Sequence, residues 1–390
     1  MPADPVSLLA ELVARPSPNP RGATPTPDCP GEAPVLEWLE SFFRPFGASL
    51  IRQAVFPGRW NLLAELPSRH RGPALLLTAH ADTVPAEGMT IPPFEPSIRN
   101  GRLYGRGSCD PKGGLAAMLA AIADYLAEHG GHFECPVAFA ATCNEESGAD
   151  GARRLAEVYG STFWGAVVAE PTGLCIVNRH KGALRYRITI QGVAAHSSEP
   201  EKGVSALHAA AALLLDIEGP YRNALASRLH PALGFPRVSV GILQGGRQVN
   251  VVPDHAILDL DRRTLPGEPE ETVRRELEAR IAAVAQTADP RIRFSLQLLE
   301  QYPPLDLETE APLSRLLAAS CERTLRRAAF EPAHFGTDGG VFSEKGVPSL
   351  VFGPGSIRQA HTADEWIAIE EVRLAHKVYK SLLDLWDQMP

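Results

Sequence analysis

Apolar and polar positions along the chain follow two different periodicities. From about Asn61, short apolar runs alternate with longer segments in which apolar residues recur at helical spacing. Short apolar runs between polar residues are typical of strands buried on both faces of a parallel sheet. We expect such strands at NLLAEL, ALLLTA, VAFAAT, AVVA and SLVFGPG. The first half and the C-terminal end of the chain therefore predict a mostly parallel sheet flanked by helices.

The helices of this α/β domain are expected at four main segments. They are PVSLLAELVA, VLEWLESFFRPFG, APLSRLLAASCERTL and VRLAHKVYKSLLDLW. A fifth and stronger helix is expected at DPKGGLAAMLAAIADYLAEHGG. Asp110 is predicted to cap its start, Pro111 suits its first position and Gly130 follows its end.

The pattern changes near Cys175. RYRITIQG alternates like a half-exposed strand, and the segments after it predict a helix, two strands, a helix and a last strand. This β-α-β-β-α-β order is the signature of a ferredoxin-like α+β domain. We therefore expect a catalytic domain in two parts, residues 1–176 and 301–390, interrupted by a domain at residues 177–300.

Acidic and histidine residues stand just after the apolar runs. They are His80, Asp82, Asp110, Glu145, Glu146, Glu170 and His361. In open α/β sheets ligands bind at the carboxyl ends of the strands, so these residues are expected to converge on one edge. Two imidazoles and several carboxylates there are what a two-metal hydrolytic site needs.

Each residue has a possible task in such a site. The ligand count for two ions is met by His80, Asp110, Glu146, Glu170 and His361, with one carboxylate bridging. The pair Glu145–Glu146 offers one ligand and one general base, because successive side chains at a strand end diverge. Asp82 lies two residues from His80 and can orient its imidazole.

Taken singly, these residues have simpler explanations. His80 alone can be a hydrogen-bonded loop residue, the Glu145–Glu146 pair a solvated turn, and Asp110 only a helix cap. GRGSCDPKGG lacks the GxxxxGK[ST] spacing of a phosphate loop. Cys109 and Cys143 are interpreted as small buried side chains rather than ligands, since a thiolate is unusual among so many carboxylates. The coincidence of all five ligand-type positions is what favours a metal site.

Composition excludes several other classes. The net charge of −8 argues against nucleic acid as a partner. No apolar run reaches the roughly 18 residues of a membrane span, and the N-terminal sequence does not read as a secretory signal. The six cysteines form no CxxC pair, which suits a reduced cytoplasmic protein.

The motifs carry a family resemblance over nearly the whole chain. The segments are HADTVP, GRGSCDPKGG, NEESG, AEPTG, GVAAHSSEPEKGVSA, QVNVVPD, DRRTLPGE and GPGSIRQAHTADEW. The chain resembles the dinuclear zinc amidohydrolases and exopeptidases that include acetylornithine deacetylase, succinyl-diaminopimelate desuccinylase and the glutamate carboxypeptidases. GPGSIRQAHTADEW is most similar to the acetylornithine deacetylase branch.

The resemblance assigns the residues to roles. It implies that His80 and Glu170 bind one zinc ion, that Glu146 and His361 bind the other, and that Asp110 bridges them. Glu145 would be the general base and Asp82 the carboxylate behind His80. Two departures, Asn144 in place of an acidic residue and Pro111 in place of a common Met, remove no ligand.

The resemblance also assigns residues beyond the metal ligands. In the inserted domain, His196 would reach the active site of a partner subunit in a homodimer and stabilise an oxyanion. Arg263 would hold a substrate carboxylate with Asn250 nearby, and Gly336 and Thr337 would form a turn that lines the substrate. Without the resemblance, His196 can equally cap a turn and Arg263 can form a surface ion pair.

The resulting hypothesis is a metal-dependent amidohydrolase that acts on a small-molecule N-acyl amino acid. N-acetylornithine or a related N-acetyl amino acid is the expected substrate. Two divalent ions, zinc or else cobalt or manganese, are the expected cofactors. The alternatives are a succinyl-diaminopimelate desuccinylase, a dipeptidase or carboxypeptidase with the same site, a catalytically silent ligand-binding paralogue, and an α/β binding protein without metal.

Overall fold

The computed structural model describes residues 3–21 and 23–389 and divides into two compact units. The larger unit comprises residues 1–179, 305–332 and 337–390, and the smaller comprises residues 180–304 and 333–336. The predicted junctions at residues 177 and 300 lie within four residues of the observed ones. The return of the short segment 333–336 to the smaller unit was not predicted.

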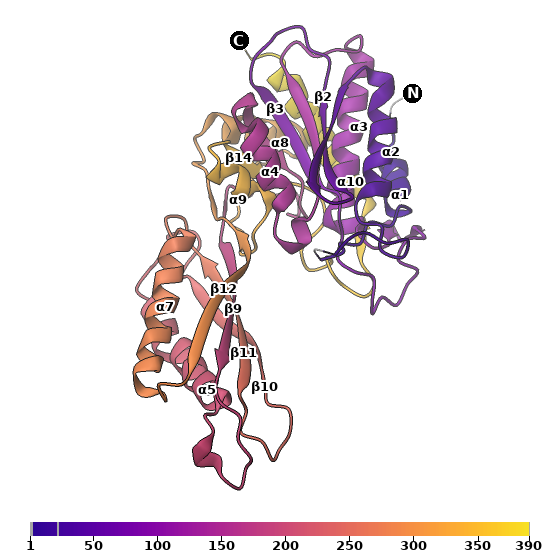
Figure 1. Ribbon diagram of the computed structural model, residues 1–390. Coiled ribbons are helices and arrows are strands. Elements are labelled where there is room, and N and C mark those ends of the chain that lie inside the picture. The colour runs from indigo at the N-terminus through magenta and orange to yellow at the C-terminus, as the bar shows by residue number, and fades with distance from the viewer. Residues whose placement is uncertain (1–2, 22, 390) are drawn as a thin grey trace. The chain divides into compact units, whose positions relative to one another are not determined.

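A six-stranded sheet forms the centre of the larger unit (Figure 1). Its order is β1 (Ser49–Phe56), β2 (Arg59–Glu65), β6 (Val137–Thr142), β3 (Ala74–His80), β7 (Phe163–Val168) and β14 (Ser349–Val351). The neighbours β6, β3, β7 and β14 run parallel, whereas β1 and β2 pair antiparallel at one edge. The predicted fold class, a mostly parallel sheet flanked by helices, is confirmed.

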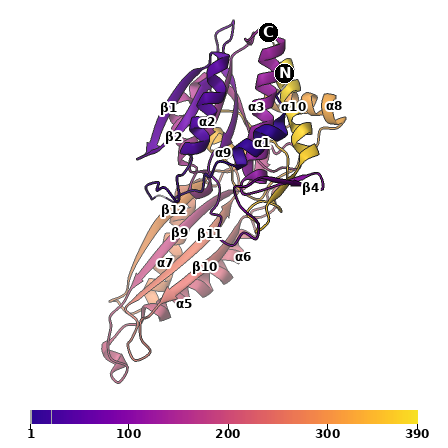
Figure 2. The same ribbon diagram turned by 90° about the vertical axis from the view of Figure 1, so that its right-hand side faces the viewer.

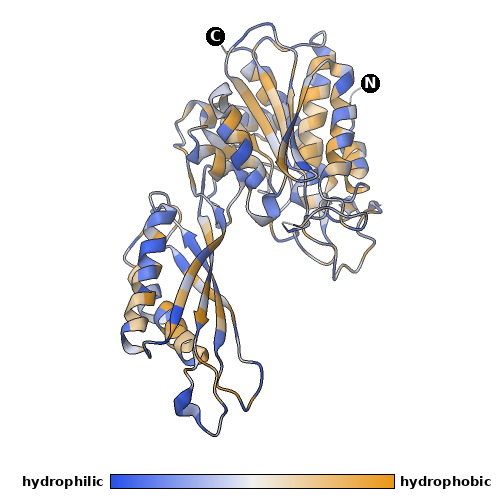
Figure 3. Ribbon diagram, viewed as in Figure 1, coloured by the Kyte–Doolittle hydropathy of each residue, from blue (hydrophilic) through white to orange (hydrophobic). Residues whose placement is uncertain are grey.

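Alternate residues of the central strands enter two different cores. On β3, Leu75, Leu77 and Ala79 join one large apolar cluster, while the intervening Leu76 is buried on the opposite face. The large cluster is completed by α1 (Pro5–Val13), α2 (Ala33–Phe43), α3 (Gly113–Glu128), α8 (Pro312–Leu325) and α10 (Ile369–Trp386). The opposite face is covered by α4 (Asp150–Tyr159) and α9 (Asp338–Glu344). Figure 3 shows the apolar colour concentrated on these strands and on α3.

Shorter elements complete the larger unit. A small antiparallel sheet combines β4 (Ser97–Arg99), β5 (Arg102–Tyr104) and β15 (Trp366–Ala368). At the junction of the two units, two strands of two residues each, β8 (Arg179–His180) and β13 (Leu305–Asp306), pair with one another. Within residues 3–21 and 23–389, no helix is both long and apolar enough to cross a membrane.

The smaller unit has the predicted β-α-β-β-α-β order (Figure 2). Its elements are β9 (Gly182–Gln191), α5 (Ala206–Asp216), α6 (Arg222–Leu225), β10 (Arg237–Gly245), β11 (His255–Thr264), α7 (Glu270–Thr287) and β12 (Arg293–Tyr302). The strands pair antiparallel in the order β10-β11-β9-β12, which is the ferredoxin-like arrangement. One core joins the sheet to α5 and α7, which both cover the same face.

The predicted start of α3 is wrong. The helix begins at Gly113 rather than at Asp110, and no side chain caps it. Asp110 has extended backbone (φ −124°, ψ 103°), and its amide donates to the Glu365 carboxylate instead of entering a helix. The loop before α3 is therefore shaped by a long-range contact that local helix signals do not contain.

Candidate metal centre

The parallel strands bring the predicted residues to one edge of the sheet. His80 is the last residue of β3 and lies in register with Thr142, the last residue of β6. Glu145 follows three residues after β6, and Glu170 follows two residues after β7. Because β3, β6 and β7 run parallel, these side chains emerge from the same edge, as expected.

Two groups of ligand-type atoms share Asp110. One group contains His80, Asp110 and Glu170, and the other contains Asp110, Glu146 and His361, with the ligand atoms of each group within 4.8 Å of one another. His80 Nε2 lies 3.1 Å from Asp110 Oδ1, while His361 Nε2 lies 3.3 Å from Asp110 Oδ2. The two oxygens of one carboxylate thus face two different histidines, which is the geometry of a bridging ligand.

The electrostatics of the cluster fit cations between these groups. Burial, reinforced by the surrounding carboxylates, raises the pKa of Glu170 well above its usual value, and burial also raises the pKa of Glu146. Glu170 Oε1 is buried and has no hydrogen-bond partner among the described residues. Hydrogen bonds to Asp110 and Glu146 raise the pKa of His361 to about 10. Two divalent ions would fit this cluster for three reasons: its carboxylates repel one another, one buried carboxylate oxygen lacks a hydrogen bond, and its donors are histidines and carboxylates.

Glu145 lies beside the ligands without belonging to either group. It is in a 3₁₀ turn that covers Glu145–Ser147, so the strand-end alternation from which the sequence analysis reasoned does not apply. The turn nevertheless separates the two glutamates: Glu146 Oε1 lies 3.2 Å from His361 Nε2. Burial is the main cause that raises the pKa of Glu145, and the nearby Asp338 adds to it. Such a carboxylate is suited to accept a proton near neutral pH.

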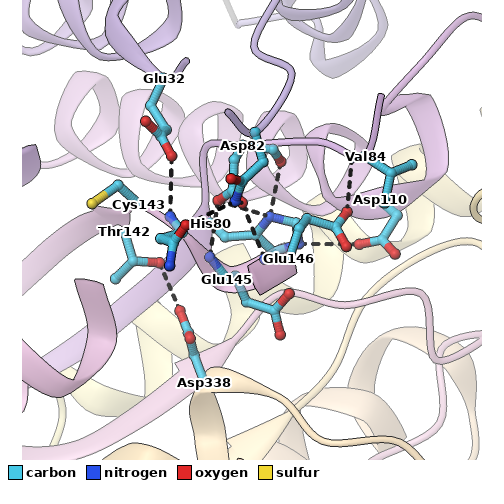
Figure 4. A network of polar contacts seen from close by, with 12 residues as sticks. Glu32, His80, Asp82, Val84, Asp110, Thr142, Cys143, Glu145, Glu146 and Asp338 are labelled. Atoms are coloured by element: carbon cyan, nitrogen blue, oxygen red, sulfur yellow. Dashed lines mark hydrogen bonds and ion pairs between the residues drawn. The ribbon is translucent and has the colours of Figure 1, made fainter. Parts of the chain in front are cut away.

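Asp82 contacts His80, as expected, and also holds the turn that carries the two glutamates. His80 Nδ1 lies 2.9 Å from the backbone oxygen of Asp82 and 3.6 Å from its carboxylate. The fully buried carboxylate also accepts hydrogen bonds from the amides of Glu145 (3.1 Å) and Glu146 (3.0 Å) (Figure 4). A further hydrogen bond comes from Asn19 Nδ2 (2.6 Å). Asp82 therefore contacts the imidazole through both its main chain and its carboxylate, and the carboxylate also holds the glutamate turn.

A buried ion pair holds the residue before the glutamates. Arg59 and Glu32 are both nearly inaccessible and form a two-point ion pair. Glu32 accepts from the Asn144 amide (3.0 Å), and Arg59 Nη1 donates to Asn144 Oδ1 (3.1 Å). Asn144 has a left-handed φ of 65°, a conformation that Asn adopts more readily than most residues. The sequence analysis missed Glu32, Arg59 and Asn19, because single polar residues in a Pro-rich loop and a strand carry no periodic signal.

Glu365 is a further residue of the centre that no sequence pattern indicated. Its buried carboxylate accepts from the amides of Gly107 (2.9 Å), Cys109 (2.9 Å) and Asp110 (3.1 Å), and from Arg106 Nη1 (2.8 Å). Glu365 thus fixes the loop that presents Asp110. Glu365 stands four residues after His361. One segment of the chain therefore carries a ligand-type side chain, His361, and the carboxylate that holds the loop of another, Asp110.

A cavity adjoins this centre in the larger unit. Its volume is about 840 Å³, and its lining includes Asn19, Val84, Phe94, Arg106 and His361. Because His361 belongs both to the cavity wall and to a ligand group, a small molecule in the cavity would reach the cluster. Cys109 and Cys143 are buried, burial raises the pKa of both thiols, and neither belongs to a ligand group.

The smaller unit carries His196, Asn250 and Arg263. Within this unit, Arg263 lies far from Asn250. His196 and Val251 form an isolated antiparallel β-bridge, and the Ser197 amide donates to the backbone oxygen of Asn250 (3.0 Å). His196 and Asn250 therefore lie close together. Arg263 lies near the far end of β11, which begins at His255. Eight strand residues span on the order of 25 Å, so the expected clamp of Arg263 beside Asn250 does not form within one chain.

Gly336 and Thr337 lie at the start of α9. A side chain at Gly336 would clash with Tyr302, since an added Cβ would lie 2.6 Å from the Tyr302 Cβ. Thr337 is buried, and its hydroxyl caps α9 by accepting from the Gly339 amide (3.1 Å). These contacts give both residues a structural task, while a substrate contact stays a prediction.

Comparison with known proteins places this centre in a family. A family model described as peptidase family M20/M25/M40 matches residues 76–385, a range that contains all of the ligand-type residues above. The chain belongs to the M20/M25/M40 peptidase family. It is therefore a metal-dependent hydrolase of amide bonds.

Relatives within the M20 family match most of the chain. The chain is 32% identical over 390 residues to an acetylornithine deacetylase of Photorhabdus laumondii, with 97% of this chain and 96% of the relative covered. It is 30% identical over 346 residues to an acetylornithine deacetylase of Myxococcus xanthus, covering 87% and 88%. Among solved structures, an M20 metallo-carboxypeptidase from Sulfolobus solfataricus has the same fold, with a TM-score of 0.80, 19% identity, and 99% and 100% coverage.

Proposed function

We propose that this M20 hydrolase cleaves the amide bond of an N-acyl amino acid, and that the acyl group is small. N-acetylornithine and related N-acetyl amino acids are the first substrates to test. The observation that carries the proposal is the pair of ligand groups that share Asp110, with Glu145 beside them. Support for the acyl group comes from the two acetylornithine deacetylases at 30–32% identity.

The ligand set proposed for two divalent ions, with zinc as the expected metal, follows the two groups. His80 and Glu170 would hold one ion, Glu146 and His361 would hold the other, and Asp110 would contribute to both groups. Ions bound there would polarise the acyl carbonyl and lower the pKa of water.

The protein side chains would carry the proton transfers and the positioning. Glu145 accepts a proton from the attacking water and returns it to the leaving nitrogen. Asp82, through the Glu145 and Glu146 amides, keeps the base and the ligand in fixed relation. Arg263 would pair with the carboxylate of the amino acid, for which a guanidinium is well shaped.

We also propose that the active unit is a homodimer formed through the smaller unit, with His196 of each chain acting in the site of its partner to stabilise the oxyanion. The separation of Arg263 from His196 and Asn250 along β11 supports this arrangement, because one chain does not bring all three to one substrate. Mixing Glu145→Gln chains with His196→Ala chains tests it. In a mixed dimer one site would receive both intact residues, so activity should partly return. Verified heterodimers without recovery would contradict it.

A hydrolysis screen tests the substrate class. N-acetyl, N-formyl and N-succinyl amino acids and dipeptides would be compared, each N-acetyl amino acid together with its α-carboxamide. We expect the free acids to be hydrolysed much faster than the amides, and Arg263→Ala to remove that preference. Equal rates on acid and amide would exclude Arg263 from recognition. Preference for dipeptides or N-succinyl substrates would instead identify the exopeptidase or desuccinylase alternative.

A further inference from the structure

One end of the sheet in the smaller unit collects three cationic side chains. Lys181 immediately precedes β9, Arg237 begins β10, and Arg263 is the next-to-last residue of β11. In the antiparallel pairing of β10 with β11, Arg237 lies directly opposite Arg263. Like charges placed directly opposite each other destabilise a sheet, so this pairing calls for a compensating anion.

The protein itself supplies little of that compensation. Arg263 Nε lies 2.7 Å from Asp261 Oδ1, and the same carboxylate also faces Arg185. In the described part of the chain, neither Lys181 nor Arg237 forms an ion pair with a carboxylate. The Lys181 ammonium is buried and donates to the Phe235 carbonyl oxygen (2.6 Å), a neutral partner.

These side chains surround a pocket of about 430 Å³. Its lining includes Lys181, Leu233, Phe235, Arg237, Arg263 and His334, and none of its lining residues is acidic. Burial, together with Lys181 and Arg237, lowers the pKa of His334, so this imidazole is neutral near pH 7 and can accept or donate one hydrogen bond. The pocket thus presents two guanidinium groups and the Lys181 amine against a single shared carboxylate. Burial and the neighbouring arginines lower the pKa of Lys181, and an anion bound in the pocket would favour its charged form.

This charge balance leaves room for two negative charges, whereas the proposed function uses only one. One substrate carboxylate on Arg263 would leave Lys181 and Arg237 uncompensated. The α-carboxylate and a side-chain carboxylate both belong to the amino acid half of an N-acyl amino acid. A carboxylate of the acyl group lies on the other side of the scissile bond. A second carboxylate in the same pocket therefore points to the amino acid side chain.

We propose that Lys181, Arg237 and Arg263 form a specificity pocket for N-acyl derivatives of acidic amino acids, in which Arg263 binds the α-carboxylate and Arg237 with Lys181 binds the side-chain carboxylate. This inference rests on the proposed function for its substrate class. It selects among N-acetyl amino acids, and it disfavours the side-chain ammonium of N-acetylornithine.

Nearly isosteric substrates give the sharpest test. N-acetyl-L-glutamate and N-acetyl-L-glutamine differ by one charge, and kcat/KM for the two is compared in the unaltered metal-loaded enzyme and in Arg237→Gln. A hydrogen-bonded charged group contributes enough to predict a preference of about tenfold to a hundredfold for glutamate. Arg237→Gln should reduce this ratio by about tenfold. The control is Arg275→Gln, which alters an exposed arginine on α7 that forms an ion pair with Glu271, and it should keep the ratio.

The possible outcomes separate this inference from the proposed function. If N-acetylglutamine or N-acetylornithine is hydrolysed as well as N-acetylglutamate, the pocket is overturned and the proposed function stands. The enzyme could instead prefer N-succinyl-L-glutamine over N-acetyl-L-glutamate and lose that preference in Arg237→Gln. This result would assign the second carboxylate to the acyl group and would also overturn the proposed pocket. If no N-acyl amino acid is hydrolysed, the proposed function fails. In that case, calorimetry on the chelator-treated protein tests the pocket separately, by measuring the binding of N-acetylglutamate and N-acetylglutamine. Tighter binding of N-acetylglutamate that Arg237→Gln weakens would support the pocket. Equal binding of the two compounds would overturn it.

Discussion

At the scale of single residues, two adjacent glutamates have different surroundings and therefore different expected tasks. Glu146 faces His361 within a ligand group, and its backbone amide is held by Asp82. Glu145 is held by the same carboxylate, yet its own side chain belongs to neither ligand group. The division follows from the 3₁₀ turn at Glu145–Ser147, which points the neighbouring side chains in different directions.

This division predicts two distinct variants. Glu145→Gln should keep both metal ions but lose about 10²–10⁴ in kcat, because the general base is gone while the ligands remain. Glu146→Gln should bind fewer ions. Elemental analysis and steady-state kinetics on the same preparations measure both effects. Near-normal turnover in Glu145→Gln would show that another group is the base.

At the scale of elements, buried carboxylates hold the loops that carry the ligands. Asp82 binds the turn after β6, and Glu365 binds the loop between β5 and α3. Each carboxylate accepts hydrogen bonds from backbone amides in a loop where no helix or strand supplies an acceptor. Such acceptors are needed because buried amides are rarely left without a hydrogen bond. The loops are therefore rigid parts of the centre.

Glu365→Gln should weaken metal binding although Glu365 is not a ligand. The substitution puts an amide donor against backbone amides and leaves Arg106 without its carboxylate, and removing one partner of a buried ion pair costs about 3–5 kcal/mol. Metal titration and thermal unfolding measure the effect. The matched control is Glu370→Gln, an exposed position on α10, which should change neither. Equal metal affinity in both variants would refute the clamp.

The sequence predicted the elements of the site better than their details. His80, Glu145 and Glu170 were expected at one edge because apolar runs mark buried strands, and parallel strands end together. The cap role of Asp110 and the pairing of Arg263 with Asn250 within one chain were wrong, and the hold of the Asp82 carboxylate on the glutamate turn was not predicted. Each of these depends on a long-range contact or on the length of a strand between two motifs, and neither is contained in local spacing. The roles of Glu32, Arg59 and Glu365 in the site were not predicted for the same reason.

At the scale of the whole molecule, the negative charge of the centre links stability to pH and metal. Burial raises the folded-state pKa of Glu145, Glu146 and Glu170 above the ordinary value of 4.5, and hydrogen bonds raise that of His361 from 6.5 to about 10. A group whose pKa is raised by folding stabilises the fold below its unfolded pKa and loses that contribution as pH rises through the folded pKa. All four groups therefore contribute less stability as pH rises, and for His361 this loss covers the range from about 6.5 to about 10.

The metal-free protein should accordingly lose stability as pH rises from about 6.5 to about 10. Bound cations favour the ionised carboxylates and neutral imidazoles, so the difference in Tm between loaded and metal-free protein should widen as pH rises. Thermal unfolding of both forms across this range measures it. A difference in Tm that is constant or shrinks with pH would contradict the assignment of these residues as ligands.

The central claim is that Asp110 joins two metal sites on which hydrolysis depends. The most direct measurement is the metal content of the purified chain by elemental analysis, beside its rate of hydrolysis of N-acetyl amino acids, before and after chelation and in Asp110→Asn. We predict two divalent ions per chain in the active protein, loss of both metal and activity on chelation with recovery on adding zinc, cobalt or manganese, and failure of Asp110→Asn to retain both ions. Full hydrolysis by a demonstrably metal-free preparation, or two tightly bound ions in Asp110→Asn, would contradict it.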